Sequence, residues 1–304
     1  MRKNILITGG TGFVGRHLTK LLVANGFSVS IMSRTKKVNT ETVFYYTWDV
    51  GKQTMEEEAV QKADYIIHLA GANIAGKPWT DKRKNEIVSS REQAAQLIYD
   101  TLQKTNTELE AFVSASAVGI YGAMNGQAIC HEDMQPANDF LGLTCQKWEV
   151  AADAFEKLGI RTVKIRTGLV MGENDGFLKK LAPVFKFKLG AALGSGKQYM
   201  PWIHIDDLCR IYLEAIQNPE MRGAYNAAVS DDTTNESFSK VLAKVYGYKL
   251  WLPNVPSFLI KLVLGEMSKL LLTGRRVSDA KIKKLGFQFK HTNLEATLKD
   301  CLSL

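Results

Sequence analysis

Cysteine is scarce in this chain, and none of it is spaced for metal binding or for a redox pair. The four cysteines, Cys130, Cys145, Cys209 and Cys301, are scattered over 304 residues. The paired spacing that a zinc site or a redox-active disulfide requires is absent. We therefore expect four free thiols, no metal site and a reducing, cytoplasmic compartment.

Long hydrophobic runs, internal repeats and low-complexity segments are also missing. The chain leads from Met1-Arg2-Lys3 directly into a predicted strand, so we expect no signal peptide. The most apolar stretch, 258–272, is interrupted by Lys261, Glu266 and Lys269, and is too short and too charged to span a bilayer. We expect a packing helix there, with a surface for a second copy of the chain as the alternative, and no membrane partner.

Acidic residues are outnumbered, but not in the manner of a nucleic-acid-binding protein. The net charge is +8, and the 45% apolar and 23% charged residues are typical of an ordinary globular protein. A length of 304 residues allows one large α/β domain, or one domain with a smaller additional part. The lysine clusters at 179–188 and 281–284 alternate with apolar residues, which is typical of solvated faces. We therefore expect no nucleic-acid partner; the alternative use of the charge is to attract anionic ligands such as cofactor phosphates.

What is present begins with a glycine-rich turn. The apolar run 4–7 predicts a buried strand, and apolar residues at helical spacing over 18–24 predict a helix. Between them lies Thr8-Gly9-Gly10-Thr11-Gly12-Phe13-Val14-Gly15. Such glycines let the backbone approach a pyrophosphate, to which the helix N-terminus offers free N–H groups. The pattern predicts a dinucleotide site; the alternative is a turn that merely requires glycine.

The end of the second predicted strand, 27–32, indicates which dinucleotide binds. An acidic residue there would accept hydrogen bonds from the ribose hydroxyls of NAD, whereas this chain has Ser33 and Arg34. An arginine fork suits the oxygens of a 2′-phosphate. The pair therefore predicts NADP(H), and the alternative is a basic surface turn.

Further cofactor contacts are predicted after the next two strands. Asp49 ends the third strand and offers an acceptor to the adenine amino group, and the turn Leu69-Ala70-Gly71 lets a cofactor lie close to the backbone. His68, at the end of the fourth strand, is more typical of a core residue. On the long helix predicted over 81–104, Glu86 and Arg91 either reach the cleft or belong to an exposed charged face.

Two later segments are candidates for the chemistry. Strands alternate with helices, which predicts a doubly wound parallel sheet whose ligands bind beyond the carboxyl ends of the strands. The fifth strand, 110–116, ends at Ser116 and is followed by Tyr121. The polar and aromatic stretch 198–207 indicates a second part of the site, although Asp206 also fits the N-cap of the next helix.

Together these residues resemble the extended, sugar-nucleotide-epimerase-like branch of the short-chain dehydrogenase/reductase superfamily. The resemblance is carried by the segments 8–15, 68–71, 114–122 and 166–172. It narrows to uncharacterised epimerase-family proteins with a small C-terminal domain of unknown function (DUF1731-like), through 147–149, 194–207, 264–266, 274–277 and 286–287. The likeness covers essentially the whole chain. NADP-binding members of the subgroup share the Ser33-Arg34 pair, and the resemblance implies that Glu86 and Arg91 lie near the cofactor.

The expected architecture is a Rossmann-type, doubly wound α/β fold with a mostly parallel sheet of about seven strands and a smaller, mainly helical C-terminal lobe. We expect an NADP-binding domain over 1–172 that returns at about 203–228. The segments 173–202 and 229–304 would then form a substrate lobe, with 250–300 as a small C-terminal helical domain.

One departure from the superfamily concerns catalysis. Its catalytic tyrosine stands four residues before a lysine that lowers the phenol pKa, but here Leu143 precedes Lys147, and leucine cannot transfer a proton. The resemblance assigns Ser116 to orient a substrate carbonyl, with Ser114 as the weaker candidate because the register slips by one residue here. His204 and Asp206 are our hypothetical replacement bases, and the substrate pocket would include the residues Tyr121, Pro201 and Trp202.

The sequence thus predicts an NADP(H)-binding atypical short-chain dehydrogenase/reductase, an oxidoreductase or epimerase-type enzyme that transfers hydride on a small carbonyl or alcohol. The candidate catalytic residues are Ser116, Lys147, His204 and Asp206. The alternative, favoured by Leu143, is a non-catalytic NADP(H)-binding regulatory or redox-sensing protein; some subgroup members carry cell-division-related labels. A homodimer is compatible with the sequence.

Overall fold

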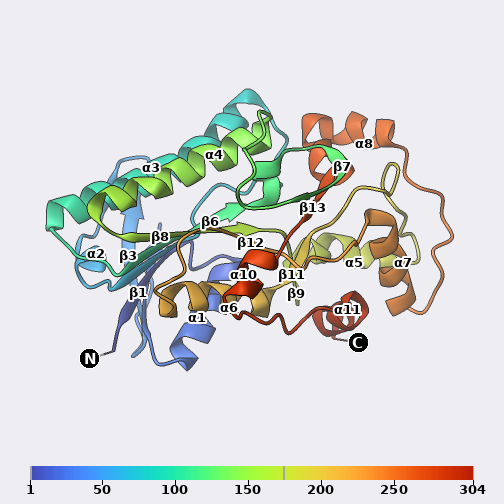
Figure 1. Cartoon of the computed structure of the whole chain (residues 1–304). Coiled ribbons are helices and arrows are strands. Elements are labelled where there is room, and N and C mark those ends of the chain that lie inside the picture. Colours follow the sequence, from blue (N-terminus) through green and yellow to red (C-terminus); the bar gives the residue numbers. More distant parts are fainter. Residues whose placement is uncertain (1, 174, 304) are drawn as a thin grey trace.

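A computed structural model describes residues 2–173 and 175–303 and contains one eight-stranded sheet (Figure 1). Its order is β12-β8-β6-β5-β1-β2-β3-β4, and every neighbouring pair is parallel except β3 and β4. The strands are β1 (Asn4–Thr8), β2 (Ser28–Ser33), β3 (Val43–Asp49), β4 (Thr54–Met55), β5 (Tyr65–His68), β6 (Ala111–Ala117), β8 (Arg161–Thr167) and β12 (Gly223–Ala227). The doubly wound fold is confirmed, with the two-residue β4 beyond the expected seven strands.

The chain reverses direction across the sheet next to its first strand. From β1 it builds outward through β2 and β3, and then returns to place β5 on the other side of β1. In an open α/β sheet such a reversal leaves a crevice beyond the carboxyl ends of the two strands, where ligands bind. The topology therefore locates a site at the ends of β1 and β5.

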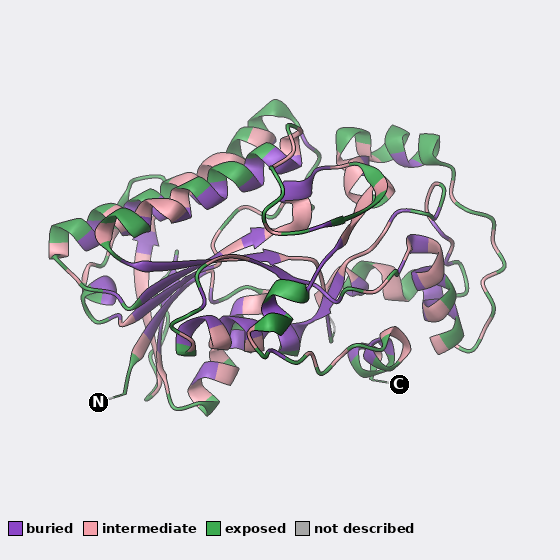
Figure 2. Cartoon of the chain, viewed as in Figure 1, coloured by how far each residue is buried: buried purple, intermediate pink, exposed green. Residues whose placement is uncertain are grey.

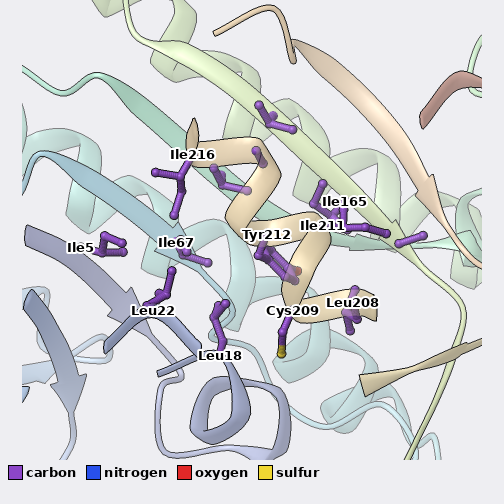
Figure 3. Close-up of a cluster of buried hydrophobic side chains, with 14 of the residues drawn as sticks. Ile5, Leu18, Leu22, Ile67, Ile165, Leu208, Cys209, Ile211, Tyr212 and Ile216 are labelled. Atoms are coloured by element: carbon purple, nitrogen blue, oxygen red, sulfur yellow. The ribbon is translucent and has the colours of Figure 1, made fainter. Parts of the chain in front are cut away.

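Helices cover both faces of the sheet (Figure 1). On one face lie α1 (Phe13–Ala24) and α6 (Ile205–Gln217), and on the other α3 (Asp81–Thr105) and α4 (Phe140–Asp153). Alternate strand residues point to opposite faces, so Ile5 and Ile7 pack with α1 and α6 whereas Leu6 packs with α3. Figure 3 shows the first of these cores, with Leu18 of α1 near Tyr212 of α6.

The second core is aromatic at its centre. The rings of Phe112 on β6 and Phe155 stack with their centroids 3.7 Å apart, and both side chains are fully buried. Phe155 belongs to η2 (Ala154–Leu158), which follows α4, while α2 (Glu58–Gln61) covers the same face of the sheet farther along. The sheet is thus closed on both faces, which leaves its carboxyl edge as the accessible side.

Most of the remaining elements form a smaller region beyond that edge, whereas the segment around Ile282 and Phe287 packs on the first core. They include two short sheets, β10-β9-β11 and β13-β7, as well as helices, so this region is less purely helical than expected. Their bounds are η1 (Val118–Tyr121), β7 (Asn125–Cys130), β9 (Leu169–Gly172), β10 (Asp175–Gly176), α5 (Leu178–Lys186), β11 (Trp202–His204), α7 (Asn235–Val245), α8 (Ser257–Leu264), η3 (Gly265–Ser268), α9 (Lys269–Leu272), β13 (Gly274–Val277), α10 (Ala280–Lys284) and α11 (Leu294–Leu302).

The segment 192–199 ties this region together, and it is called the strap below. Gly194 N–H donates to the Val255 carbonyl over 2.8 Å, and the Gln198 side-chain amide donates to the carbonyl of Leu271 over 2.8 Å. At Gly274 the two segments come so close that a Cβ would lie 1.8 Å from the Tyr199 carbonyl oxygen. Only glycine fits there.

The apolar stretch 258–272 divides into two parts with different environments. Met267 and Leu270 pack against a small core around Trp79 and Ile87. On α8, by contrast, Ile260 alone is buried and Leu264 is half-buried, while Phe258, Leu259, Leu262 and Val263 are exposed (Figure 2). The predicted packing helix is therefore wrong for α8. Among the described residues, no helix is both long and apolar enough to cross a membrane.

Candidate functional site

The glycine turn after β1 leaves no room for side chains. Gly9 has a φ of +70°, and a Cβ there would lie 2.9 Å from the carbonyl carbon of Leu69. A Cβ on Gly15 would lie 2.5 Å from the Cα of Gly10, so Gly15 lets α1 pack onto the turn. Gly12 is the N-cap of α1, and no side chain caps the helix. The first N–H groups of α1 therefore remain available to an anion.

A cleft of about 720 Å³ opens along this turn at the carboxyl edge of the sheet. Ten of the predicted cofactor residues line it: Gly9, Thr11, Gly12, Ser33, Arg34, Asp49, Leu69, Ala70, Gly71 and Glu86. Its other lining residues are Met32, Trp48, Val50, Gly51, Ala72, Asn73, Arg83, Ser90 and Ala94. The volume is within the range of small-molecule and cofactor sites.

Four predicted cofactor residues support this cleft without lining it. Phe13 packs its ring against Gly172 and Gly176, Val14 joins the α1 core, and Gly15 is the packing glycine described above. Arg91 is buried, with its guanidinium carbon 3.0 Å from where a Cβ of Gly71 would lie. Their positions make them structural supports of the turns that face the cleft.

Arg91 holds the turn after β5 from below. Its Nη1 donates to the carbonyl of Ala72 over 3.1 Å and to that of Ile87 over 2.7 Å, and its guanidinium lies 4.6 Å from the ring centre of Trp148. Burial lowers the pKa of Arg91 from its ordinary value. Nearer the opening, Arg83 donates to Glu86 over 2.7 Å, and this hydrogen bond lowers the pKa of Glu86.

The ends of β2 and β3 present polar groups of both signs. The Ser33 hydroxyl accepts from the Thr35 backbone N–H over 3.3 Å. Arg34 is exposed and forms no ion pair within the described part of the chain. The Asp49 carboxylate accepts from the Lys52 backbone N–H over 3.1 Å, which leaves its second oxygen toward the surface and a long contact of 3.9 Å to the Lys52 ammonium.

His68 is a core residue, as expected. It is fully buried, and its Nδ1 lies 2.8 Å from the Thr8 hydroxyl, which also accepts from the Ala70 N–H over 3.2 Å. Burial lowers the pKa of His68 to about 4. The ring is therefore neutral at physiological pH and joins the ends of β1 and β5.

Ser116 belongs to a buried polar network behind the cleft. Its hydroxyl donates to Glu149 Oε1 over 2.7 Å, and Glu149 receives Nε and Nη2 of Arg166 over 2.8 and 2.9 Å. Arg166 also donates to the Tyr121 hydroxyl over 3.1 Å, and that hydroxyl donates to Asn226 Oδ1 over 2.6 Å. The network thus joins β6, α4, η1, β8 and β12.

The two charged side chains of this network, Glu149 and Arg166, form an ion pair. Burial opposes the charge of Arg166, but the hydrogen bonds that Arg166 donates to Glu149 raise the pKa of Arg166 above its ordinary value. Burial raises the pKa of Tyr121 to about 12. Tyr121 is therefore a neutral hydroxyl inside a closed network, and the structure does not place it on the surface of a substrate pocket.

His204 and Asp206 lie outside the cleft, contrary to their proposed role as bases. His204 caps α6 by accepting the Asp206 backbone N–H at Nδ1 over 3.2 Å, so its own proton sits on Nε2, which points to Asp300 at 3.3 Å. Its ring stacks on His291 with centroids 3.8 Å apart. Burial and the His291 ring lower the pKa of His204. The Asp206 side chain is exposed, so the N-cap of α6 is the histidine, not the aspartate.

This cluster also contains potential metal ligands. Donor atoms of His204, Asp300 and Cys301 lie within 4.8 Å of one another, and so do those of His204, Asp206 and His291. A metal at Nε2 of His204 would have to displace its proton and the 3.3 Å contact with Asp300. Without a metal, His204 caps the N-terminus of α6 and contacts Asp300 of α11.

Pro201 and Trp202 connect elements of the smaller region. The Pro201 carbonyl accepts from the Leu169 N–H over 2.7 Å. Trp202 is fully buried, and its indole N–H donates to Asp231 over 2.9 Å. Trp202 is thus a core side chain, and neither residue lines the described cleft.

Family models match this chain in two consecutive parts. Residues 5–228 match the model of the NAD dependent epimerase/dehydratase family, and residues 255–301 match a domain of unknown function, DUF1731. The chain belongs to the NAD dependent epimerase/dehydratase family. Curated relatives agree: an "epimerase family protein" of Bacillus subtilis, YfhF, is 34% identical over 99% of this chain and 98% of its own length, and one of Staphylococcus aureus is 33% identical over 99% of both.

Solved structures place it in the same family. The human epimerase family protein SDR39U1, whose structure is described as containing NADPH, has a TM-score of 0.86 at 29% identity, covering 99% of both chains. A nucleoside-diphosphate sugar epimerase from Corynebacterium glutamicum has a TM-score of 0.80 at 28% identity, covering 99% of this chain and 58% of the other. One is named an epimerase family protein and the other an epimerase, which agrees with the family that the motifs resemble.

In this epimerase-family chain, α4 does not turn Lys147 toward Ser116. Lys147 is exposed, and Leu143 is 43% exposed on the same outward side of the helix. The face toward the end of β6 carries Leu141, Cys145 and Glu149, since the sulfur of Cys145 and the Cβ of Leu141 lie 3.5 and 3.6 Å from where a Cβ of Gly119 would lie. On the inward face, the two residues with the four-residue spacing of the superfamily's tyrosine and lysine are therefore Leu141 and Cys145. A leucine again stands where the tyrosine would be.

Sequence reasoning missed Arg83 and the Glu149–Arg166 pair. Arg83 lies three residues before Glu86, a spacing that favours an ion pair on a helix. Both members of the second pair stood inside motifs quoted for the family resemblance. Their pairing depends on packing between α4 and β8, and no local sequence pattern predicts that packing.

Removing the carboxylate of the buried pair should destabilise this family member. Glu149→Gln leaves the buried Arg166 without its counter-ion, so we expect the free energy of unfolding to fall by about 3 kcal/mol. Urea unfolding followed by circular dichroism measures the change. Glu58→Gln, at the exposed pair with Lys62, is the matched control and should leave the midpoint unchanged. Equal midpoints for both variants would contradict a buried pair.

The buried His68 predicts a specific acid sensitivity. Its folded-state pKa lies below the ordinary 6.5, so protons bind the unfolded chain first and stability falls as pH drops from about 6.5 toward about 4. The loss attributable to His68 amounts to about 3 kcal/mol. We expect His68→Gln to flatten the pH dependence of the unfolding free energy in this window. Parallel pH curves for wild type and variant would show that His68 is not the buried titrating group.

Proposed function

We propose that this epimerase-family protein binds NADP(H) in the cleft and transfers hydride to or from a small carbonyl or alcohol substrate. The residues at the end of β2 favour NADP(H) over NAD(H). Arg34 lines the cleft, and its guanidinium has no ion-pair partner among the described residues; Ser33 replaces the carboxylate that would receive a ribose 2′-hydroxyl. The human relative described with NADPH supports the same choice.

The residues around the cleft fit a dinucleotide at each point along it. The backbone of Gly9–Gly12 and the uncapped N-terminus of α1 suit the pyrophosphate, and Arg34 suits a 2′-phosphate. Trp48 and Asp49 line the cleft and would suit an adenine, and the small side chains of 70–71 leave space against the backbone. Bound NADP(H) would supply the hydride, while the chain holds and orients it.

In this proposal Ser116 is an orienting group. Its hydroxyl stands at the carboxyl end of β6 and is held by Glu149, which in turn is held by Arg166. To hydrogen-bond a substrate carbonyl, this hydroxyl would have to turn its single proton away from Glu149, whose carboxylate Arg166 would still hold in place. The inward face of α4 offers Leu141 and Cys145, and burial raises the pKa of Cys145 to about 12, so neither is an acid of the tyrosine–lysine kind.

That same face favours a second candidate function, a non-catalytic NADP(H)-binding regulatory or redox-sensing protein. Leucine at the inward position removes the proton donor, and the Ser116 hydroxyl is already satisfied by Glu149. A sensor needs the cleft and its cofactor preference but no proton transfer. The two candidates share cofactor binding and differ in turnover.

Calorimetric titration with NADPH and with NADH tests the cofactor. We expect NADPH to bind more tightly, and Arg34→Ala to weaken NADPH about tenfold to a hundredfold while leaving NADH unchanged, because one charged hydrogen bond to the 2′-phosphate is lost. Arg222→Ala, at an exposed arginine away from the cleft, is the control. Equal affinity for both dinucleotides would contradict the choice of NADP(H).

Turnover separates the enzyme from the sensor. With NADPH deuterated at the reactive carbon and a panel of aldehydes and ketones, the enzyme should deliver deuterium to one product. Ser116→Ala should then lower kcat by about 100-fold with NADPH affinity unchanged. Ser114→Ala is the comparison, since its hydroxyl donates to the Ala115 carbonyl of its own strand and not to Glu149. Tight NADPH binding with no deuterium transfer to any carbonyl would support the sensor instead.

A further inference from the structure

We propose that the outer end of the smaller region binds the surface of an anionic lipid bilayer. The surface, called the apolar ridge below, consists of the exposed side chains of Phe187, Leu189, Trp251, Phe258, Leu259, Leu262 and Val263. This inference is independent of the function proposed for the cleft, because none of these residues lines it.

The helix α8 provides half of the ridge. Its side chains at 258, 259, 262 and 263 lie on one side of the helix, and Leu262 and Val263 are 80% and 79% exposed. The opposite side holds Ile260, which is buried. An exposed aliphatic and aromatic stripe of this kind is what interfacial helices insert between lipid headgroups.

The other half comes from two segments that run beside each other toward α8. The Trp251 indole N–H donates to the Lys188 carbonyl over 2.9 Å, and Leu193 forms a β-bridge with Val255. Phe187 and Leu189 therefore flank Trp251, and the chain continues from there into α8 (Figures 1 and 2). The ridge therefore combines two segments that are far apart in the sequence but are joined to each other by Trp251 and Val255.

The charge of the molecule is concentrated in the same region. Residues 173–202 and 229–304 contain 17 Lys and Arg against 9 Asp and Glu, whereas the rest of the chain contains 22 of each. The whole net charge of +8 thus belongs to these two segments, although Lys281, Lys283 and Lys284 stand on α10, which packs on the first core through Ile282 and not beside the ridge. A positive field of this size attracts an anionic surface.

The lysines beside the ridge are available to bind anions because the acidic side chains of these segments have other partners. The acidic side chains in these two segments already have partners, such as Lys240 for Glu236, Arg276 for Asp232 and Lys244 for Glu295. Beside the ridge stand the exposed Lys186, Lys188, Lys249 and Lys261, and none of them forms an ion pair within the described part of the chain. Their ammonium groups are free to meet lipid phosphates.

Two features favour a bilayer over a protein partner. A second copy would bring two positive ridges together, and like charges repel. Protein interfaces are depleted in lysine, yet every cation named beside the ridge is a lysine, whose stem can lie along apolar surface while its head stays in water. This proposal replaces our expectation of no membrane partner, which rested only on the inability of 258–272 to span a bilayer.

The full chain carries its own reporter for the test. Four of the five tryptophans are buried and Trp251 is 65% exposed, so a change in solvent around the ridge dominates the emission. With vesicles of about 30 mol% phosphatidylglycerol in phosphatidylcholine at low salt, we expect co-sedimentation and a blue shift of emission. Pure phosphatidylcholine vesicles should give neither, and raising the salt to about 0.5 M should release the protein.

Two double variants and a matched control identify the surface. Leu262→Ser with Val263→Ser, and Lys186→Glu with Lys188→Glu, should each weaken binding to the anionic vesicles at least tenfold. Leu143→Ser with Val150→Ser, at exposed apolar positions of α4, should bind as the wild type does. NADPH affinity, measured in parallel, shows that each variant is folded, and circular dichroism replaces it if the wild type binds no NADPH.

Three results would overturn the proposal. One is no sedimentation of the wild type with anionic vesicles at low salt. Another is sedimentation that is the same in all variants, which would place lipid contact elsewhere. The third is a wild-type dimer in light scattering that becomes monomeric in the Leu262→Ser and Val263→Ser variant without any lipid binding, which would assign the ridge to a second copy of the chain.

Discussion

The contact between two turns governs the rest of this structure. Because β1 and β5 pair in parallel with Thr8 opposite His68, both strands end at the same level and their following turns meet. Gly9 lets the turns touch backbone to backbone, and the Thr8 hydroxyl joins them through His68 and Ala70. The cleft exists because no side chain fills this junction.

The two halves of the carboxyl edge differ in how far their polar groups are satisfied. Around the cleft, Arg34 and the first N–H groups of α1 lack protein partners in the described chain, so they are ready for an anionic ligand. Behind it, Ser116, Glu149, Arg166 and Tyr121 satisfy one another. One half is built to receive a ligand and the other to hold the strand ends in register. This contrast explains why cofactor binding is easier to infer than chemistry.

The predictability of each residue followed the range of the interactions that place it. The turn, Ser33-Arg34 and the small residues after β5 were placed by a local strand–turn–helix pattern, since the parallel sheet brings such turns to one edge. Lys147 was expected to face the site because Leu143 and Lys147 have the four-residue spacing of the catalytic pair. Leu141 and Cys145 have the same spacing, and only packing against Gly119 shows that these two face inward. His204 resembled a catalytic base in its sequence setting, but its partners His291 and Asp300 come from the far end of the chain.

The close approach at Gly274 has a consequence for how this protein can be divided. The family model of the C-terminal part begins at residue 255, yet the strap at 192–199 donates hydrogen bonds to it and passes so near Gly274 that no side chain fits between them. The C-terminal part is therefore not a detachable module. A chimera that exchanges it must exchange the strap as well, so the natural unit of recombination here is discontinuous in sequence.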